Sequence, residues 1–214
     1  MKKDYSKEKI PYADSKAGLP KGNKDIDFSK IPKADKEKLK AIKSKLDIFK
    51  KKVNEKFSKY IAGIALLPPP RPEEGKKPEK NKIGLLILID DSDSKKMPKE
   101  ELKNKLGTII KSIAEKIDKD IETRVVILSE LWQSCYDGKH DLLQLIAMSA
   151  PIQDKGMLQA IKIAEIHKTM VLKKFEKYII SYVLAGSLVQ GRATKTSDID
   201  VWIVIDDTDV KRMT

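Results

Sequence analysis

Residues 185–205 read AGSLVQGRATKTSDIDVWIVI, and this stretch sets the expectations for the fold. It places a Gly-Ser turn ahead of an apolar run that carries acids at alternate positions, Asp198 and Asp200. Side chains alternate between the two faces of a strand, so the sequence predicts a strand on which both acids share one face. The other face is predicted to bury in a core and carries Ile199, Val201, Ile203 and Ile205.

The two acids predict a metal site. Asp198 and Asp200 would stand close together on a rigid element, where like charges repel unless a cation lies between them. Hard divalent cations prefer oxygen ligands of this kind. We therefore expect both carboxylates to bind Mg²⁺ or Mn²⁺.

The Gly-Ser turn predicts a phosphate site beside the metal. Gly186 follows an apolar run, and a glycine there lets the backbone turn sharply and lets a phosphate approach its N–H groups. Ser187 is expected to cap a short helix that begins near Leu188 and offers N–H donors to phosphate oxygens. Arg192 and Lys195 add cations in the following loop.

These residues together resemble a known signature. Gly186 and Ser187, then Gly191 and Arg192, then the run 197–200 are similar to the motif of the DNA polymerase beta-like nucleotidyltransferase superfamily, in its small prokaryotic form. The resemblance implies an α/β (α+β) fold with a mixed sheet and flanking helices. It also implies transfer of a nucleoside monophosphate from a nucleoside triphosphate to an acceptor hydroxyl, with two metal ions held by three carboxylates.

The resemblance also assigns roles to the motif residues. Asp198 and Asp200 match two of the three catalytic metal ligands. The residues expected to contact the nucleotide phosphates are Gly186, Ser187, Arg192 and Ser197.

The third carboxylate does not follow from the sequence. In the family it lies on a later strand, whereas the sequence ends at Thr214, soon after Ile205, so we expect the second unit to be incomplete. The intervening acids Asp206, Asp207 and Asp209 are interpreted as a turn and helix N-cap cluster. Glu122 is a candidate for the missing ligand, although an ordinary surface strand residue is the plainer interpretation.

An internal repeat indicates a duplication. Residues 89–97 (IDDSDSKKM) and 205–213 (IDDTDVKRM) share six of nine positions at an offset of 116. Upstream, 14 residues from Val53 and 14 from Val171 share seven positions at an offset of 118. Two linked matches in the same order predict two tandem copies of one helix–strand–turn–strand unit.

The first copy lacks the chemistry of the second. Pro68 and Pro69 stand where the second copy has its Gly-Ser turn, and proline offers no N–H group to a phosphate. Lys82 and Gly84 replace Asp198 and Asp200 by this alignment. We therefore predict a degenerate first copy that serves packing, partner binding or regulation.

The predicted organisation is a disordered Lys-rich tail over 1–32, a degenerate nucleotidyltransferase-like domain over 33–165, and the N-terminal part of a nucleotidyltransferase domain over 166–214. Apolar spacing predicts helices from Asp35 to Phe57 and over 98–117. A strand is predicted over 122–129, with Glu122 near its start, followed by three helical pieces. The last two are separated by a turn around Pro151, Asp154 and Gly156.

Charge and cysteine content bound the partners and the compartment. Residues 1–60 hold 19 lysines against nine acids, and a basic arm of this kind favours RNA, DNA or a ribosome, although a solvated Lys-rich tail is the plainer interpretation. A single cysteine, Cys135, fits a reducing cytoplasm. The sequence has no signal segment and no apolar run of membrane-spanning length, so no membrane is expected.

The primary functional hypothesis is a metal-dependent nucleotidyltransferase, with the chain itself incomplete, weakly active or inactive. A nucleotide-binding pseudoenzyme or antitoxin-like partner, and a basic nucleic-acid-binding adaptor, are the alternatives. The acceptor stays open among RNA, a protein and a small molecule.

Overall fold

The computed structural model describes residues 33–69, 82–94 and 97–206. The predicted disordered tail, most of the Pro-rich loop of the first copy, and the acids Asp207 and Asp209 lie outside the described residues. The chain divides into two compact units, 1–42 and 43–214, and the fold below is that of the second unit. Helix α1 (Lys33–Phe57) begins in the first unit and enters the second at Lys43.

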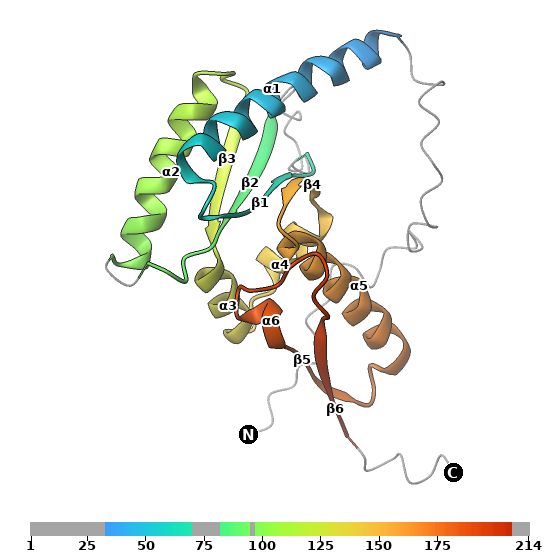
Figure 1. Cartoon of the computed structure of the whole chain (residues 1–214). Coiled ribbons are helices and arrows are strands. Elements are labelled where there is room, and N and C mark those ends of the chain that lie inside the picture. The colour runs from blue at the N-terminus through green and yellow to red at the C-terminus, as the bar shows by residue number, and fades with distance from the viewer. Residues whose placement is uncertain (1–32, 70–81, 95–96, 207–214) are drawn as a thin grey trace, which may run out of the picture. The chain divides into compact units, whose positions relative to one another are not determined.

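The second unit is built on a mixed four-stranded sheet. Its strands are β1 (Ile61–Leu66), β2 (Ile83–Ile89), β3 (Ile121–Ile127) and β4 (Ala150–Asp154), in the order β3-β2-β1-β4 (Figure 1). Strand β2 runs parallel to β3, and β1 runs antiparallel to both β2 and β4. Helix α2 (Lys99–Glu115) makes the connection that a parallel pair requires. The mixed sheet with flanking helices confirms the predicted fold class.

Both faces of this sheet are buried, which explains the unbroken apolar run IGLLILI in β2. Leu86 and Leu88 belong to a core cluster whose other members come largely from the helices that follow β3. Leu85, Ile87 and Ile89 point to the opposite face and are fully buried as well. Buried residues of α1 and α2 in the second unit include Phe49, Val53 and Ile110. The predicted helices over 35–57 and 98–117 are therefore confirmed.

Two predicted boundaries are wrong. Helix α3 (Leu128–Tyr136) begins directly after β3, so the last two residues of the predicted strand over 122–129 are helical. The Asp91 carboxylate accepts hydrogen bonds from the Ser129 backbone N–H (3.0 Å) and from its hydroxyl, which starts the helix at that point. In general, satisfied N-terminal N–H groups favour helix over strand.

The predicted turn around Pro151 is strand β4. This short edge strand pairs with β1, and an edge position tolerates proline because one side of the strand needs no N–H donor. Asp154 ends it and accepts hydrogen bonds from the N–H groups of Gly156, Leu158 and Gln159. These bonds start α5 (Met157–Phe175), which follows α4 (Asp141–Met148). This segment forms a strand because it pairs with β1, which is distant in the sequence. Local composition does not encode such pairing.

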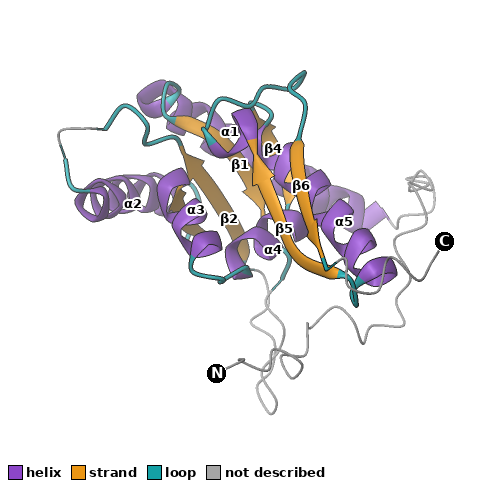
Figure 2. Cartoon of the chain, turned by 90° about the horizontal axis from the view of Figure 1, so that it is seen from below, coloured by secondary structure: helices purple, strands orange, loops and turns teal. Residues whose placement is uncertain are grey.

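A separate two-stranded hairpin carries the motif residues. It consists of β5 (Ile179–Ala185), the single turn α6 (Gly186–Val189) and the antiparallel β6 (Asp200–Ile205) (Figure 1). Figure 2 shows β5 and β6 side by side. Tyr182 joins the hairpin to α5, since its hydroxyl lies 2.8 Å from His167 Nδ1 and 3.3 Å from the Ala164 carbonyl oxygen. The helix–strand–strand order of α5, β5 and β6 matches that of α1, β1 and β2. The duplication and the domain boundary at 165/166 stay predictions.

Strand β6 is far more exposed than predicted. Ile203 and Ile205 are 41% and 49% exposed, so the expectation that they bury in a core is wrong. The alignment equates β6 with β2, whose residues Leu85–Ile89 are all fully buried. Strand β2 lies between two strands, whereas β6 pairs only with β5 among the described residues. An edge strand without covering layers leaves its apolar side chains in water.

Among the described helices, none is both long enough and apolar enough to cross a bilayer.

Candidate functional site: the Gly-Ser turn and its aspartates

The register of the hairpin brings Asp200 against Gly186. Ala185 pairs with Asp200 at the end of the β5–β6 ladder, one residue before the Gly-Ser turn. Gly186 has φ +71°, a left-handed conformation that residues with a Cβ adopt at a cost. A Cβ added at Gly186 would lie 1.8 Å from Asp200 Oδ2, which is far inside van der Waals contact. The glycine therefore leaves the space that the carboxylate occupies.

Asp198 does not lie on the strand, so the prediction that both acids share one strand face is wrong. Strand β6 begins at Asp200, and Asp198 stands in the loop that precedes it. The partner strand β5 ends at Ala185, where the chain turns into α6, so the ladder has no residue to pair with Asp198. Only two positions separate the acids in sequence, but Asp198 is free of the strand's alternation.

Helix α6 begins two residues earlier than predicted. Its first residue is Gly186, and Ser187 lies inside the turn, so the serine is not the N-cap. The helix has only four residues, so its dipole is small, and the predicted help from a helix N-terminus is correspondingly weak. The Ser187 side chain makes no hydrogen bond with any part of the chain that the structure describes.

The motif is anchored on the core. Leu188 in α6 is fully buried, and Ala193, after the turn at Gly191, is 8% exposed. Both residues pack into the main core cluster. Gly191 has φ +71° and turns the chain, and the Arg192 N–H donates to the Ser187 carbonyl oxygen at 2.9 Å. The exposed Arg192 guanidinium donates to the Gln190 side-chain oxygen. These contacts hold the turn in one geometry.

The loop that leads to Asp198 packs closely against Gly156. A Cβ at Gly156 would lie 2.4 Å from the Thr194 carbonyl carbon and 2.6 Å from the Lys195 nitrogen. The Ser197 hydroxyl accepts from the Thr194 N–H at 2.9 Å, so this predicted phosphate contact is engaged within the loop. The sequence predicts Gly156 only as part of a turn. Its contact with this loop comes from tertiary packing and has no signal in the local sequence.

The two aspartates fit a divalent cation. Both residues are exposed, and neither carboxylate takes part in a hydrogen bond or ion pair with the described residues. Mg²⁺ is commonly bound by one or two carboxylates together with substrate phosphates and water. No group of three or more His, Cys, Asp or Glu side chains suited to a metal occurs over residues 33–69, 82–94 and 97–206. Asp198 and Asp200 are thus two exposed carboxylates without protein partners in the described residues, and their binding of a metal stays a prediction.

Glu122 lies in the first copy and already has a partner. It pairs in register with Gly84 near the start of β3, and its carboxylate lies 2.6 Å from Lys82 Nζ. The alignment places Lys82 and Gly84 at the positions of Asp198 and Asp200. In the predicted first copy, the Lys82 ammonium therefore pairs with the acid beside these positions, whereas the predicted second copy carries two carboxylates there.

Comparison with known proteins supports the motif. Residues 164–212 match the family model described as a nucleotidyltransferase domain. This segment includes most of α5, from Ala164 onward, and the whole hairpin, and the match confirms the resemblance for this part of the chain. Neither a curated protein nor a solved structure matches the chain.

Proposed function

We propose that the nucleotidyltransferase segment at 164–212 binds a nucleoside triphosphate with a divalent metal and transfers its nucleoside monophosphate to an acceptor hydroxyl. The observation that carries this proposal is the contact between Asp200 and the Gly186 position of the Gly-Ser turn. The Asp200 carboxylate thereby lies beside the Gly-Ser turn. This arrangement suits a metal ion on one side and phosphate oxygens on the other.

Each motif residue has a distinct role in this proposal. Asp198 and Asp200 hold Mg²⁺ or Mn²⁺, which supplies charge stabilisation to the attacking and leaving oxygens in phosphoryl chemistry. The Ser187 hydroxyl, which is free of protein partners in the described part, donates to a phosphate oxygen. Arg192 adds a positive charge to the same loop. Ser197 supports the loop through Thr194 and reaches a phosphate only if that bond opens.

The two-carboxylate site favours binding over turnover. The family chemistry uses a third carboxylate, and the residues that the structure describes show no cluster of three such ligands. We therefore expect residues 1–214 to bind nucleotide weakly and to release little pyrophosphate. A nucleotide-binding pseudoenzyme or antitoxin-like partner is the second candidate function, and the same observation favours it.

The proposed acceptor classes are RNA, a protein and a small molecule. The basic arm at the N-terminus makes a nucleic acid the one acceptor class with support from charge. In the described part of the arm, α1 presents the exposed lysines Lys43, Lys51, Lys52 and Lys56. Phosphate contacts of this kind weaken steeply as salt rises. The basic arm also supports a competing proposal, in which the protein is a nucleic-acid-binding adaptor that does not bind nucleotides.

Equilibrium dialysis of labelled ATP and CTP, with Mg²⁺ and then with a chelator, tests the proposal. We expect binding that requires Mg²⁺ and that falls at least tenfold in Asp198→Asn and in Asp200→Asn. Glu176→Gln is the matched control, because this exposed carboxylate follows α5 outside the motif. Binding that is unaffected by either aspartate substitution contradicts the proposed site, and binding of RNA alone favours the adaptor.

Pyrophosphate release then separates an enzyme from a pseudoenzyme. Weak or absent release by a chain that binds MgATP supports the pseudoenzyme interpretation. Rapid turnover by residues 1–214 would contradict the expectation of an incomplete site and would require a third ligand from the first copy. Glu122→Gln in the active protein is the first variant to examine in that case.

A further inference from the structure

Asp198 lies outside strand β6, so its position depends on the loop that carries it. The loop spans 190–199, between α6 and β6. The ladder of β5 and β6 stops at Asp200 and does not hold this loop. Contacts with other parts of the chain must therefore determine where the Asp198 carboxylate lies.

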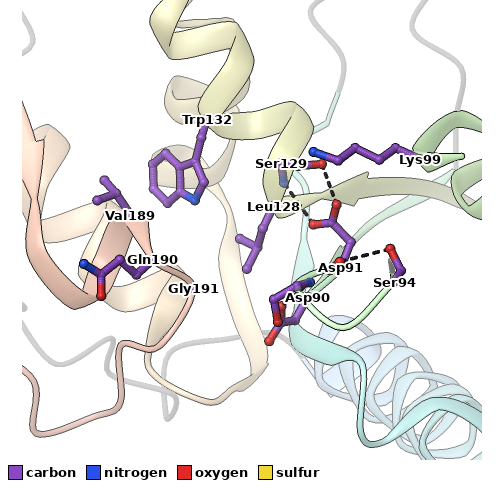
Figure 3. Close-up of a pocket in the computed structure, with 11 residues that line it drawn as sticks. Asp90, Asp91, Ser94, Lys99, Leu128, Ser129, Trp132, Val189, Gln190 and Gly191 are labelled. Carbon is purple, nitrogen blue, oxygen red and sulfur yellow. Dashed lines mark hydrogen bonds between the residues drawn. The ribbon is translucent and has the colours of Figure 1, made fainter. Parts of the chain in front are cut away.

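The start of the loop is held at Gly191. A Cβ at this position would lie 3.2 Å from Leu128 Cδ1 and 3.8 Å from Asp90 Oδ1, so the loop backbone passes close to the end of β3. Figure 3 shows Gly191 at a pocket whose walls also include Leu128 and Trp132. Two residues later, Ala193 is buried in the main core cluster. The first part of the loop is thereby fixed on the core.

The middle of the loop is held at Gly156, the residue before α5. A Cβ at Gly156 would lie 2.4 Å from the Thr194 carbonyl carbon, 2.7 Å from the Thr194 carbonyl oxygen and 2.6 Å from the Lys195 nitrogen. All three are backbone atoms, which cannot rotate away as the end of a flexible side chain can. Only a residue without a side chain allows this approach. The path of the loop therefore depends on the glycine at this position.

Gly156 is itself held in place. Its N–H donates to Asp154 Oδ1 at 2.9 Å, and the same carboxylate accepts from the N–H groups of Leu158 and Gln159 at 3.0 and 2.9 Å. Met157 and Leu158 are each 2% exposed and belong to the main core cluster. Gly156 thus presents to the loop a surface that is continuous with the core.

Hydrogen bonds connect this contact to Asp198. The Thr194 N–H donates to the Ser197 hydroxyl at 2.9 Å, and the Ser197 N–H donates to the Thr194 carbonyl oxygen at 3.2 Å. These two bonds close residues 194–197 into a turn, and Asp198 is the next residue. On its other side, Ile199 packs against the main core cluster. Asp198 is therefore an exposed residue between two that are held in place.

We propose that Gly156 is a positioning residue for Asp198. Its contact with Thr194 and Lys195 sets the path of the loop, and the loop sets where the Asp198 carboxylate lies relative to Asp200. Gly156 acts through the loop and not by contact with metal or nucleotide. The inference rests on the proposed function where it concerns metal binding by Asp198, whereas the effect of Gly156 on the loop is independent of that function.

Gly156→Ala tests the proposal, and Gly138→Ala is its matched control. Alanine at either position must adopt a positive φ, which is +123° at Gly156 and +74° at Gly138. A Cβ at Gly138 meets no heavy atom within 4 Å, so the control has the backbone strain without the close contact. Far-UV circular dichroism and urea unfolding establish whether each variant folds. If Gly156→Ala does not fold, Asp154→Ala replaces it, because this variant removes the hydrogen bonds that hold Gly156.

Hydrogen exchange of the Thr194 and Ser197 amides, detected by NMR in nucleotide-free protein, measures the effect on the loop. Both amides are hydrogen-bonded in the turn, and we expect Gly156→Ala to speed their exchange about tenfold. Asp154→Ala should change the exchange in the same direction, whereas Gly138→Ala should leave it unchanged. Unaltered exchange of both amides in Gly156→Ala, or in Asp154→Ala where that variant replaces it, overturns the proposal.

A double-mutant cycle on MgATP binding connects the loop to Asp198. Gly156→Ala should weaken binding about fivefold in the unmodified chain and in Asp200→Asn, but less than about twofold in Asp198→Asn, where the carboxylate that it positions is already lost. An equal loss in Asp198→Asn overturns the positioning role. If the unmodified chain binds no MgATP, the proposed function fails, and the exchange rates alone decide whether Gly156 positions the loop.

Discussion

Substitution of Gly186 by alanine separates the architecture of the proposed nucleotide site from the stability of the fold. An alanine at this position meets two obstacles at once. Its backbone must keep φ near +71°, which costs a residue with a Cβ roughly 1–2 kcal/mol. Its methyl carbon would stand 1.8 Å from Asp200 Oδ2 and 2.8 Å from Asp200 Cγ. The Asp200 side chain must therefore leave its position.

The two obstacles have different consequences. Asp200 is exposed, so its carboxylate can rotate into water at little cost to folding. The free energy of unfolding should therefore fall by about 1–2 kcal/mol, mainly from the backbone term. Binding of MgATP should fall more than tenfold, because the carboxylate no longer stands beside the turn that holds the phosphates.

Gly107→Ala is the control from the same chain. Gly107 lies inside α2, and a Cβ there has no heavy atom within 4 Å. Alanine in a helix interior is more favourable than glycine by about 0.5–1 kcal/mol, so this variant should gain stability and keep its nucleotide binding. Urea unfolding and equilibrium dialysis of MgATP measure the two quantities on both variants. A Gly186→Ala protein that binds MgATP as the unmodified chain does would refute the reasoning.

Three further predictions concern the fold. Leu86→Ala should lower the free energy of unfolding by about 2–5 kcal/mol because Leu86 is fully buried, whereas Trp202→Ala should change it by less than about 1 kcal/mol because Trp202 is 69% exposed; equal losses in urea unfolding would contradict the contrast between β2 and β6. The hydrogen bond from Lys45 holds the pKa of Asp118 below its ordinary value. This pair therefore stabilises the protein above the ordinary aspartate pKa, and its contribution is lost as the pH falls through the lower folded-state pKa. Lys45→Met should remove that part of the acid dependence, as urea midpoints between pH 7 and pH 3 will show. His140 is exposed overall, but partial desolvation of its ring, with the positive charge of Lys168, lowers its pKa. The unfolded chain therefore takes up the proton first, and stability falls as the pH drops through the ordinary histidine value. The decline should be smaller in His140→Gln, and a histidine pKa above the ordinary value in NMR titration would refute this assignment.

The strong local patterns of this chain were sufficient for its main elements. The helical spacing of α1 and the helical spacing of α2 each predicted the element that forms, because the pattern lies within a single segment. The Gly-Ser turn and its acids predicted the family that residues 164–212 match. The residue types that this chemistry needs are local, and so they can be recognised without a structure.

The sequence-based predictions that were wrong concern segments whose structure depends on the strand with which they pair. Strand β4 forms because it pairs with the free edge of β1. Asp198 lies outside β6 because its partner strand β5 ends at Ala185. Likewise, β2 and β6 have similar apolar runs, but β2 is covered on both sides and β6 is not. Burial is a property of neighbours, which the run itself does not specify.

The sequence by itself determined which residues are able to bind a metal and a phosphate, and the tertiary structure decided which of them meet. Asp200 lies against Gly186 because an antiparallel register joins Ala185 to Asp200, and the pocket beside Trp132 exists because Gly191 approaches Leu128. Such contacts join segments far apart in the chain. Side-chain chemistry is fixed residue by residue, whereas proximity depends on how the whole chain packs.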